Sequence, residues 1–484
     1  MKIHRRAHFT LRGRPIHLRV FSILNIVLLS ACSAPSYLAD PSQDLAIHFQ
    51  YAQALNELKA IDWPNDHWWQ RYDDAQLNAL VNEALRSSPD MQVAQARLKY
   101  AQGMAQQAGA LNKPNVGMAA SASETKVSYA YQAYMPPENW NDYGSVGLDF
   151  SYDFDFWGKN KALIESAQFD YAAAQAQQRS AALILSTSVV NHYIELARLY
   201  ANQDTATAAL DIKHHTLDLL TKRYDNGLET QVAVSQARST AALVEADLLS
   251  IQEAIALQKN AIAALLGNGP DRGLSLSRPA LVFSTAIGIP DDLALGLLGH
   301  RADISIARWH AQAAANRIDY AKAQFYPDIK LSAFIGYQSF GLNSLFNSGN
   351  DAGNVGAAIY LPLFSGGRLE GQLTVAESHY EEAVALYNAT LIRALQEVAN
   401  AITSNQKLSA RIAKMQEAVD AASVAYQTSR HRYSGGLSTY LDVLTAENAL
   451  INSQQALVNL ESRSFSLDVA LIHALGGGYH STPL

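Results

Sequence analysis

Two hydrophobic spacings alternate along the chain, and each of them occurs twice. After Pro114 and again after Pro327, apolar residues recur at every second position, which is typical of strands with one apolar face. The clearest run is 146–156, in which Val, Leu, Phe and Tyr alternate with small or acidic residues. Further alternating runs lie at 115–128, 329–338 and 355–364. The pattern predicts four strands in two hairpins, with loops at 129–142 and 341–353.

Long segments of helical composition follow each predicted strand hairpin. Neither 159–226 nor 372–434 contains Gly or Pro, and at 1.5 Å per residue each would extend roughly 100 Å as a helix. After a tight turn, 228–266 and 437–475 return over about 55 to 60 Å. Such lengths cannot be buried in a globule of this size. The sequence therefore predicts two coiled-coil hairpins that project from the sheet.

The chain consists of two similar halves. The turns between the long helices share the motif Arg-Tyr-x-x-Gly-Leu at 223–228 and 432–437, an offset of 209 residues. Upstream, the segment 90–114 matches 303–327 at an offset of 213 residues. An internal repeat of about 210 residues predicts that each half contributes one strand pair and one helical hairpin.

The remaining segments connect these repeated parts. Apolar residues spaced i, i+3, i+4 over 77–85 predict a helix, and Pro89 separates it from a second helix over 91–111. Residues 267–290 are rich in Gly and Pro and predict an irregular connector. The predicted division is a leader (1–31), an N-terminal part (32–112), strand hairpin 1 (113–156), helical hairpin 1 (157–267), a connector (268–302), a helix (303–326), strand hairpin 2 (327–364), helical hairpin 2 (365–476) and a tail (477–484).

The first 31 residues have the features of an export signal. Basic residues precede the apolar run 20–29, and Leu-Ser-Ala-Cys at 29–32 resembles a bacterial lipobox, which is cleaved before its cysteine. Cys32 is the single cysteine, so it is the predicted lipidation site and the exported chain is expected to form no disulfide. A signal peptide with a generic cleavage site is the alternative. By resemblance, Ser33 favours sorting to the outer membrane.

Charge argues against nucleic acid as a partner. The whole chain has 37 Lys and Arg, 44 Asp and Glu, and a formal net charge of −7. Residues 1–31 hold six basic and no acidic residues, so without them 31 basic and 44 acidic residues remain, a net charge of −13. A chain with this balance repels a phosphate backbone.

The sequence gives no indication of catalysis or of a cofactor. Outside the leader, the histidines form no His-x₃-His pair, which is a common helical spacing of zinc ligands, and no cysteine supports them. Nucleophile elbows, phosphate-binding Gly loops and dinucleotide Gly motifs are absent with the required flanks. We therefore expect no metal, no cofactor and no enzymatic activity.

The predicted strands have the length of membrane-crossing strands. Runs of about 10 to 13 residues fit a tilted crossing of the bilayer, and a polar face opposite the apolar one suits a water-filled lumen. A soluble sheet with one buried face is the alternative. In a membrane, four strands cannot close, so chains would have to share one barrel. Two chains would give eight strands and a filled interior, and three would give twelve strands and a lumen.

An ordered set of motifs runs through both halves. The motifs are Cys32 in its lipobox, Trp68-Trp69, Ser88-Pro89-Asp90, Asp-Phe-Trp-Gly-Lys at 155–159, Leu-Pro-Leu-Phe-Ser-Gly-Gly-Arg at 361–368 and the two Arg-Tyr-x-x-Gly-Leu turns. Together they resemble the outer-membrane factors of Gram-negative tripartite efflux pumps, in particular their acylated outer-membrane lipoproteins. The resemblance implies an α+β membrane protein, a homotrimer whose twelve-stranded β-barrel takes four strands from each chain. A long α-helical coiled-coil barrel would continue it through the periplasm.

The resemblance also implies a function. It implies a passive exit duct for drugs or other toxic small molecules, which docks to a periplasmic adaptor protein and an inner-membrane transporter. An exit duct for type I protein secretion is the alternative within transport. A different class is a lipid-anchored periplasmic coiled-coil scaffold without a pore, although such a scaffold has no use for amphipathic strands of bilayer length.

The residues after the second turn are expected to form the periplasmic gate. Leu441 would narrow the pore, and Asp442 would select cations as a ring of charge. Relatives can carry a second acid where this chain has Thr445, so each chain would contribute one acid. The alternative is a coiled-coil leucine beside a surface aspartate.

Two further groups of residues have expected roles. The residues expected at the tips that contact the adaptor are Arg223, Gly227, Leu228, Arg432, Gly436 and Leu437. Both glycines let the chain reverse with positive φ. The acidic residues expected to face the lumen, where they hydrate its wall or select cations, are Asp149, Asp153 and Asp155. One departure from the family is His-Arg-Ala-Asp at 300–303, which lacks the usual Pro and leads us to expect a blunter helix break.

Overall fold

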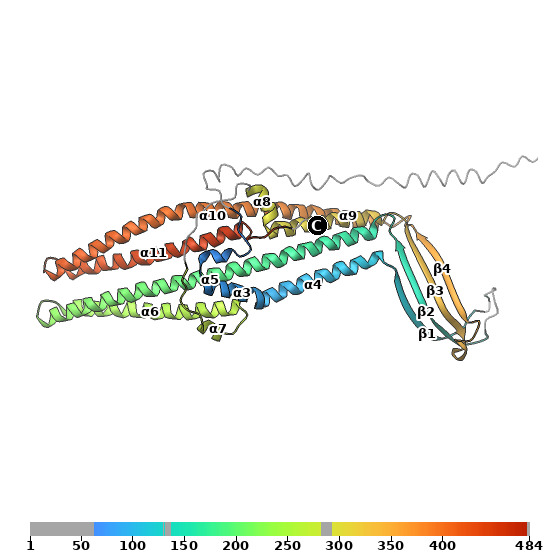
Figure 1. Ribbon diagram of the computed structural model, residues 1–484, viewed down its shortest axis with the longest axis horizontal. Coiled ribbons are helices and arrows are strands. Elements are labelled where there is room, and N and C mark those ends of the chain that lie inside the picture. The colour runs from blue at the N-terminus through green and yellow to red at the C-terminus, as the bar shows by residue number, and fades with distance from the viewer. Residues whose placement is uncertain (1–61, 129, 131–136, 282–292, 482–484) are drawn as a thin grey trace, which may run out of the picture. The chain divides into compact units, whose positions relative to one another are not determined.

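Strands and helices from both halves combine in the computed structural model, which describes residues 62–128, 130, 137–281 and 293–481 (Figure 1). All described residues belong to the unit Phe49–Leu484. Cys32 and its lipobox lie outside the described residues. Along the chain, two helices, a strand pair and a helical hairpin are followed by a connector and the same series again, as the repeat predicts.

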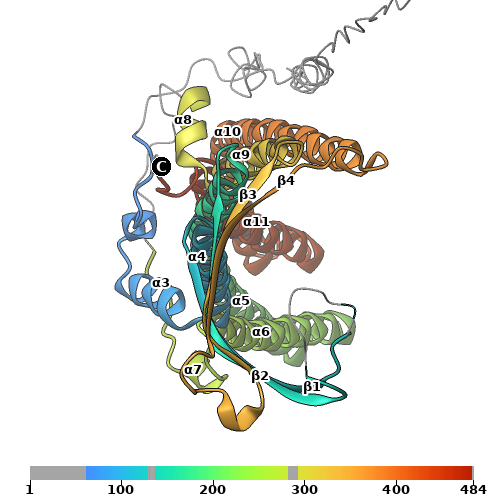
Figure 2. The same cartoon turned by 90° about the vertical axis from the view of Figure 1, so that its right-hand side faces the viewer.

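The four strands form one antiparallel sheet in the order β1-β2-β3-β4. They are β1 (Asn115–Thr125), β2 (Asn141–Phe154), β3 (Asp328–Phe340) and β4 (Asp351–Tyr360). The central pair joins the two halves, because Leu148 of β2 lies opposite Ile335 of β3 as well as Met118 of β1. Seen from its own end, the sheet is curved, and β1 and β4 form its two edges (Figure 2).

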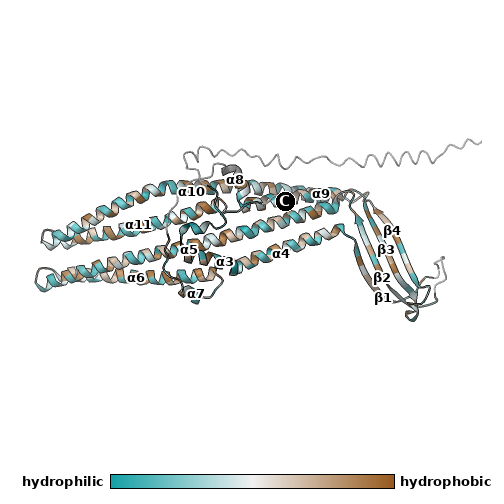
Figure 3. Ribbon diagram, in the orientation of Figure 1, coloured by the Kyte–Doolittle hydropathy of each residue, from teal (hydrophilic) through white to brown (hydrophobic). Residues whose placement is uncertain are grey.

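Each strand alternates between a polar and an apolar face, as predicted (Figure 3). Cross-strand partners share a face, so the register gathers the aliphatic residues and several aromatic residues of the four strands on one side. Many of them are widely exposed in the single chain: Val116 (62%), Met118 (75%), Ile335 (69%), Val355 (77%) and Ile359 (71%). An apolar face of this extent needs lipid or another protein to cover it.

The predicted ends of two strands are wrong. β2 ends at Phe154, so the alternation does not continue as a strand to Phe156. β4 ends at Tyr360, before the Leu-Pro-Leu-Phe segment that the alternation had included. Pro362 has no N–H to donate to a neighbouring strand, which favours a strand end at this point. β2 and β4 also begin within the predicted loops 129–142 and 341–353, so that the last two and the last three residues of those loops belong to the strands.

The predicted helical hairpins are present in both halves. The outgoing helices α5 (Lys159–Asp225) and α10 (Arg368–Ser434) contain 67 residues each, and the returning helices α6 (Gln231–Leu265) and α11 (Tyr440–Ala474) contain 35 each. At 1.5 Å per residue these lengths correspond to about 100 Å and about 52 Å. None of the described helices has the length and hydropathy of a membrane-spanning helix.

The helices form a layer with two free edges. Near the sheet, α4 (Pro89–Gly109) contacts α5, which contacts α9 (Ala302–Ala323), which contacts α10. Near the turns, α6 contacts α5, which contacts α11, which contacts α10. Therefore α4 and α6 lie at one edge of the layer, and α10 lies at the other.

The main hydrophobic core lies between these two regions. Trp68, Trp69 and Tyr72 of the short helix η1 (Trp68–Tyr72) and the apolar side of α3 (Ala75–Ser87) pack against α5, α6 and α11. Asp74 fixes the start of α3, because its carboxylate accepts the N–H of Leu77 at 3.0 Å and the hydroxyl of Tyr193 at 2.8 Å.

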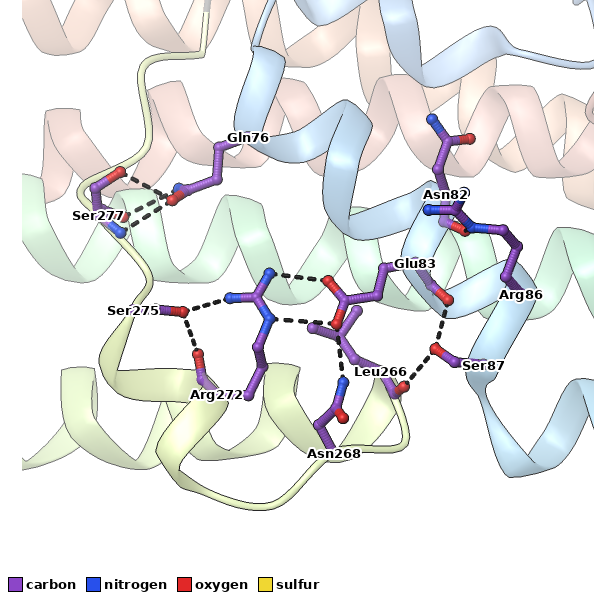
Figure 4. A network of polar contacts seen from close by, with 10 residues as sticks. All are labelled: Gln76, Asn82, Glu83, Arg86, Ser87, Leu266, Asn268, Arg272, Ser275 and Ser277. Carbon is purple, nitrogen blue, oxygen red and sulfur yellow. Dashed lines mark hydrogen bonds and ion pairs between the residues drawn. The ribbon is translucent and has the colours of Figure 1, made fainter.

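A polar network ties α3 to the connector between the halves (Figure 4). Glu83 accepts hydrogen bonds from Arg272 at 2.9 Å and from Asn268 at 2.8 Å, and the side chain of Gln76 bonds to Ser277. The connector was expected to be irregular, but its described part contains the single-turn helix α7 (Asp271–Leu274).

The helix break before α9 is sharp although it lacks proline, so the expectation of a blunter break is wrong. Arg301 alone separates α8 (Leu293–His300) from α9, and its backbone is extended. Its buried guanidinium donates to Asp303 at 2.6 Å, to Glu397 at 2.8 Å and to the carbonyl of Ala474 at 2.8 Å. Burial alone would raise the pKa of Asp303, but the bond to Arg301 and its charge hold that pKa below the usual value.

Candidate functional site

The two helical turns have the same backbone geometry. Gly227 and Gly436 adopt φ of 73° and 72°, the left-handed region that favours glycine. The N–H of Leu228 donates to the carbonyl of Arg223 at 2.8 Å, and the bond from Leu437 to Arg432 has the same length. This pattern terminates a helix while satisfying its last carbonyls. Both leucines remain exposed, at 66% and 72%.

Polar contacts join the two turns to each other. The hydroxyl of Tyr433 donates to Glu229 at 2.6 Å, and the guanidinium of Arg223 lies 4.7 Å from the Tyr433 ring centroid. Burial raises the pKa of Tyr433, and the bond to Glu229 raises it further. The same bond holds the pKa of Glu229 below its ordinary value. The phenol therefore stays protonated and the carboxylate ionised at neutral pH, which preserves this bond between the hairpins.

Leu441 and Asp442 lie on the exposed side of the first turn of α11. Asp442 completes a capping box, since its carboxylate accepts the Thr439 N–H at 3.0 Å and the Thr439 hydroxyl at 2.9 Å. The Thr439 N–H lowers the pKa of Asp442, which keeps this carboxylate charged. Leu441 is 65% exposed, whereas Val443, two residues further along α11, is buried in the core between the hairpins. Both candidates are thus free to face a lumen or another copy.

A buried ion pair links the hairpins above the turns, and sequence reasoning missed it. The Lys213 ammonium on α5 lies 2.6 Å from the Glu447 carboxylate on α11, with side-chain exposures of 3% and 1%. Lys213 also donates to Asn448 at 3.0 Å, and Thr216 donates to Glu447 at 3.3 Å. The only sequence signal was a charged residue within each helix, because the pairing depends on how α5 packs against α11.

The sheet acids do not share one environment. Asp149 and Asp153 lie on the polar face of β2, where Asp153 is 3.6 Å from Lys330 of β3. Asp155 lies beyond the strand, and its carboxylate accepts the N–H groups of Asn160 at 3.0 Å and Lys161 at 2.7 Å. It therefore caps the N-terminus of α5.

Both edges of the helix layer expose apolar residues. On α4 the exposed large side chains are Val93, Tyr100 and Met104, which recur at helical spacing. On α6 they include Leu243, Leu249 and Leu257, and on α10 they include Val375, Leu386 and Val424. Exposure of these apolar side chains to water is unfavourable, so both edges of the helix layer are suited to contacts with other copies of the chain.

Within 62–128, 130, 137–281 and 293–481, no three His, Cys, Asp or Glu side chains gather closely enough to hold a metal ion.

Comparisons with known proteins agree with this architecture. The profile of the outer membrane efflux protein family matches residues 80–268 and 296–477. The chain is 36% identical to the fusaric acid resistance protein FusA of Burkholderia cepacia over 65% of this chain and 60% of that protein. It is 27% identical to the multidrug resistance outer membrane protein MdtP of Escherichia coli over 94% of this chain and 95% of that protein.

The fold is also that of solved structures. The outer membrane protein VceC of Vibrio cholerae shares 60% identity with this chain and superposes with a TM-score of 0.82. That match covers 86% of this chain and 100% of VceC.

Proposed function

The chain belongs to the outer membrane efflux protein family, and we propose that three copies of it form one continuous duct from the periplasm to the outside of the cell. The observation that carries this proposal is the open, curved sheet with an exposed apolar face, joined to a helix layer with two exposed apolar edges. Three such sheets would close into a twelve-stranded barrel in lipid, and the helix layers would close into a tunnel.

In this arrangement the strand hairpins (113–156 and 327–364) form the membrane part, and the helical hairpins form the periplasmic tunnel. The duct is passive, because it only offers a water-filled path along polar sheet faces. Asp149 and Asp153 belong to that wall, whereas the capping role of Asp155 gives it a structural function at the barrel end.

Conductance tests this proposal. Protein extracted in detergent and added to a planar bilayer should produce discrete ion-conducting steps, because a barrel of twelve strands encloses a lumen. Protein that inserts into the bilayer without conducting, even after the gate substitutions described in the Discussion, would contradict a duct. It would favour the pore-free scaffold.

The exposed tips are the proposed contact with a periplasmic adaptor, which in turn binds an inner-membrane transporter. Leu228 and Leu437 offer apolar side chains at the turns, flanked by Arg223 and Arg432. Gly436→Asp should prevent cross-linking of the adaptor to the tip while trimers remain intact. Undiminished cross-linking and normal efflux in this variant would refute the assignment.

The proposed cargo is a range of small toxic compounds. Relatives are named for resistance to fusaric acid and to multiple drugs, which supports this class over secreted proteins. Deletion of the gene should sensitise cells to such compounds and leave protein secretion unchanged.

Lipid attachment at Cys32 is proposed from the lipobox, and Cys32→Ser should abolish the incorporation of labelled palmitate.

A further inference from the structure

The polar face of the sheet is not uniformly polar. Tyr143 of β2 and Phe334 and Phe340 of β3 lie on the same face as Asp149, because cross-strand partners share a face. Asp149 is paired with Phe334, and Tyr143 is paired with Phe340. Aromatic rings thus stand at these two levels, and a third, Tyr360 of β4, lies opposite Asp328 on the same face. The other residues of this face are small or hydrophilic.

The outer end of the Phe334 ring leans over two glycines of the sheet. It covers Gly147 and Gly336, which are themselves cross-strand partners. A Cβ atom added to Gly147 would lie 2.4 Å from Cε2 of this ring, and one added to Gly336 would lie 3.0 Å from its Cζ. The outer end of the ring is therefore close to the glycine backbone, and Phe334 as a whole is half-buried. The exposed part of its side chain is accessible from the polar face.

Asp149, the cross-strand partner of Phe334, carries a negative charge on the polar face at this level. Asp149 is exposed, and no Lys or Arg of the described chain lies within ion-pair distance of it. Asp153 lies on the same face four residues further along β2. Its charge is partly neutralised by Lys330, whose ammonium lies 3.6 Å from the Asp153 carboxylate. Phe334 and Asp149 together offer an aromatic surface next to an uncompensated negative charge.

We propose that Phe334 and Asp149 form a transient binding site for lipophilic cations on the wall of the duct. The ligand class is an amphiphile that combines an aromatic or aliphatic body with a quaternary or protonated nitrogen. Its apolar body would lie on the ring, and its charge would face the carboxylate and the π-electrons of the ring. The inference rests on the proposed duct, since only there does the polar face border a lumen.

A second pair of aromatic side chains lies on the same face, nearer to the loops that connect β1 to β2 and β3 to β4. The rings of Tyr143 and Phe340 lie with centroids 5.3 Å apart, six residues along β3 from Phe334. At about 3.3 Å per residue this separation is roughly 20 Å. A cation that leaves the Phe334 level thus meets another aromatic surface before it reaches the end of the barrel.

Block of single-channel current tests the site. Tetraphenylphosphonium added to the barrel side should reduce the conductance of the purified channel, and size-matched tetraphenylborate should do so less. Asp149→Asn and Phe334→Leu should each weaken the block by tetraphenylphosphonium about fivefold, as expected for the loss of one charge or one cation–π contact. Phe334→Leu keeps an apolar cover over the glycines, so folding is preserved.

The controls separate this site from others. Ser332→Ala, on the same face, should leave the block unchanged. Asp442→Asn should also leave block from the barrel side unchanged, because that carboxylate is at the opposite end of the helices. Equal block by both ions, or unaltered block in Asp149→Asn and Phe334→Leu channels that conduct normally, would overturn the wall site alone. A chain that never conducts would overturn the duct and the site together.

Discussion

Gly476 and Gly436 have similar backbone conformations but different surroundings. Their φ angles are 89° and 72°, so an alanine at either position adopts a strained left-handed conformation. A Cβ at Gly436 would meet no atom within 4 Å. A Cβ at Gly476 would lie 1.8 Å from the carbonyl oxygen of His300, at the end of α8. The C-terminal turn of α11 is thus packed directly against the helix break of the second half.

Alanine substitutions at Gly436 and Gly476 distinguish the cost of backbone strain from the cost of a steric clash. Gly436→Ala should lower the free energy of unfolding by about 1 kcal/mol, the cost of the left-handed conformation alone. Gly476→Ala should cost about 4 kcal/mol or more, because backbone must move as well. Thermal unfolding of the two detergent-solubilised variants gives the comparison. Equal losses would mean that the contact with His300 is not tight.

Asp442 combines a capping role with a free charge, and the two can be separated. Asp442→Ala should raise the leak conductance in bilayers, because it removes a carboxylate ring from the proposed constriction and frays the first turn of α11. Asp442→Asn keeps a side-chain acceptor for Thr439 and removes only the charge, so it should alter ion selectivity with less leak. Conductance and selectivity like those of the parent in both variants would exclude Asp442 from the gate.

At the scale of elements, the contact between the two hairpins depends on a buried charge pair. The charged groups of Lys213 and Glu447 lie 2.6 Å apart with almost no exposure to water. Removing one partner leaves a buried charge without compensation, which typically costs about 3 to 5 kcal/mol. Replacing both with apolar residues of similar volume is often neutral or stabilising.

Lys213→Met alone should therefore destabilise the protein strongly, and Lys213→Met combined with Glu447→Leu should recover most of the loss. Denaturant unfolding of the two variants and of Glu447→Leu alone completes a double-mutant cycle. If the single losses are small and simply add, the pair does not hold α5 against α11.

The elements were more predictable than their ends and their contacts. Alternation and Gly-free length identify the strands and long helices, because these patterns follow directly from periods of 2 and 3.6 residues. The end of β2 was misplaced at Phe156, since the capping of α5 by Asp155 is a contact that alternation does not encode. Likewise, the Arg-Tyr-x-x-Gly-Leu motif revealed both turns, but the bond of Tyr433 to Glu229 joins residues 204 positions apart.

The residues of the candidate sites were likewise visible in the sequence, but their contacts could not be predicted from local sequence patterns. Phe334 was visible as an apolar residue in a polar register, yet its meaning depends on the pairing with Asp149 and on two glycines from different strands. Lys213 and Glu447 look like ordinary charged helix residues until α5 and α11 are packed together.

At the scale of the whole molecule, the single chain is incomplete as a membrane protein. Its sheet has two unpaired edges, β1 and β4, and lipid cannot satisfy their N–H and C=O groups. Its helix layer likewise exposes apolar side chains on α4 and α6 at one edge and on α10 at the other. Each edge of one copy can be covered by the opposite edge of the next, which closes a ring.

The number of copies in that ring decides whether the protein can form a duct with an open lumen. Two copies would give eight strands, whose side chains fill the interior, and three would give twelve strands around a lumen. Native mass spectrometry of the detergent-extracted protein measures this number directly. The duct predicts a complex of three chains that separates only on denaturation, and a complex of one or two chains would contradict it.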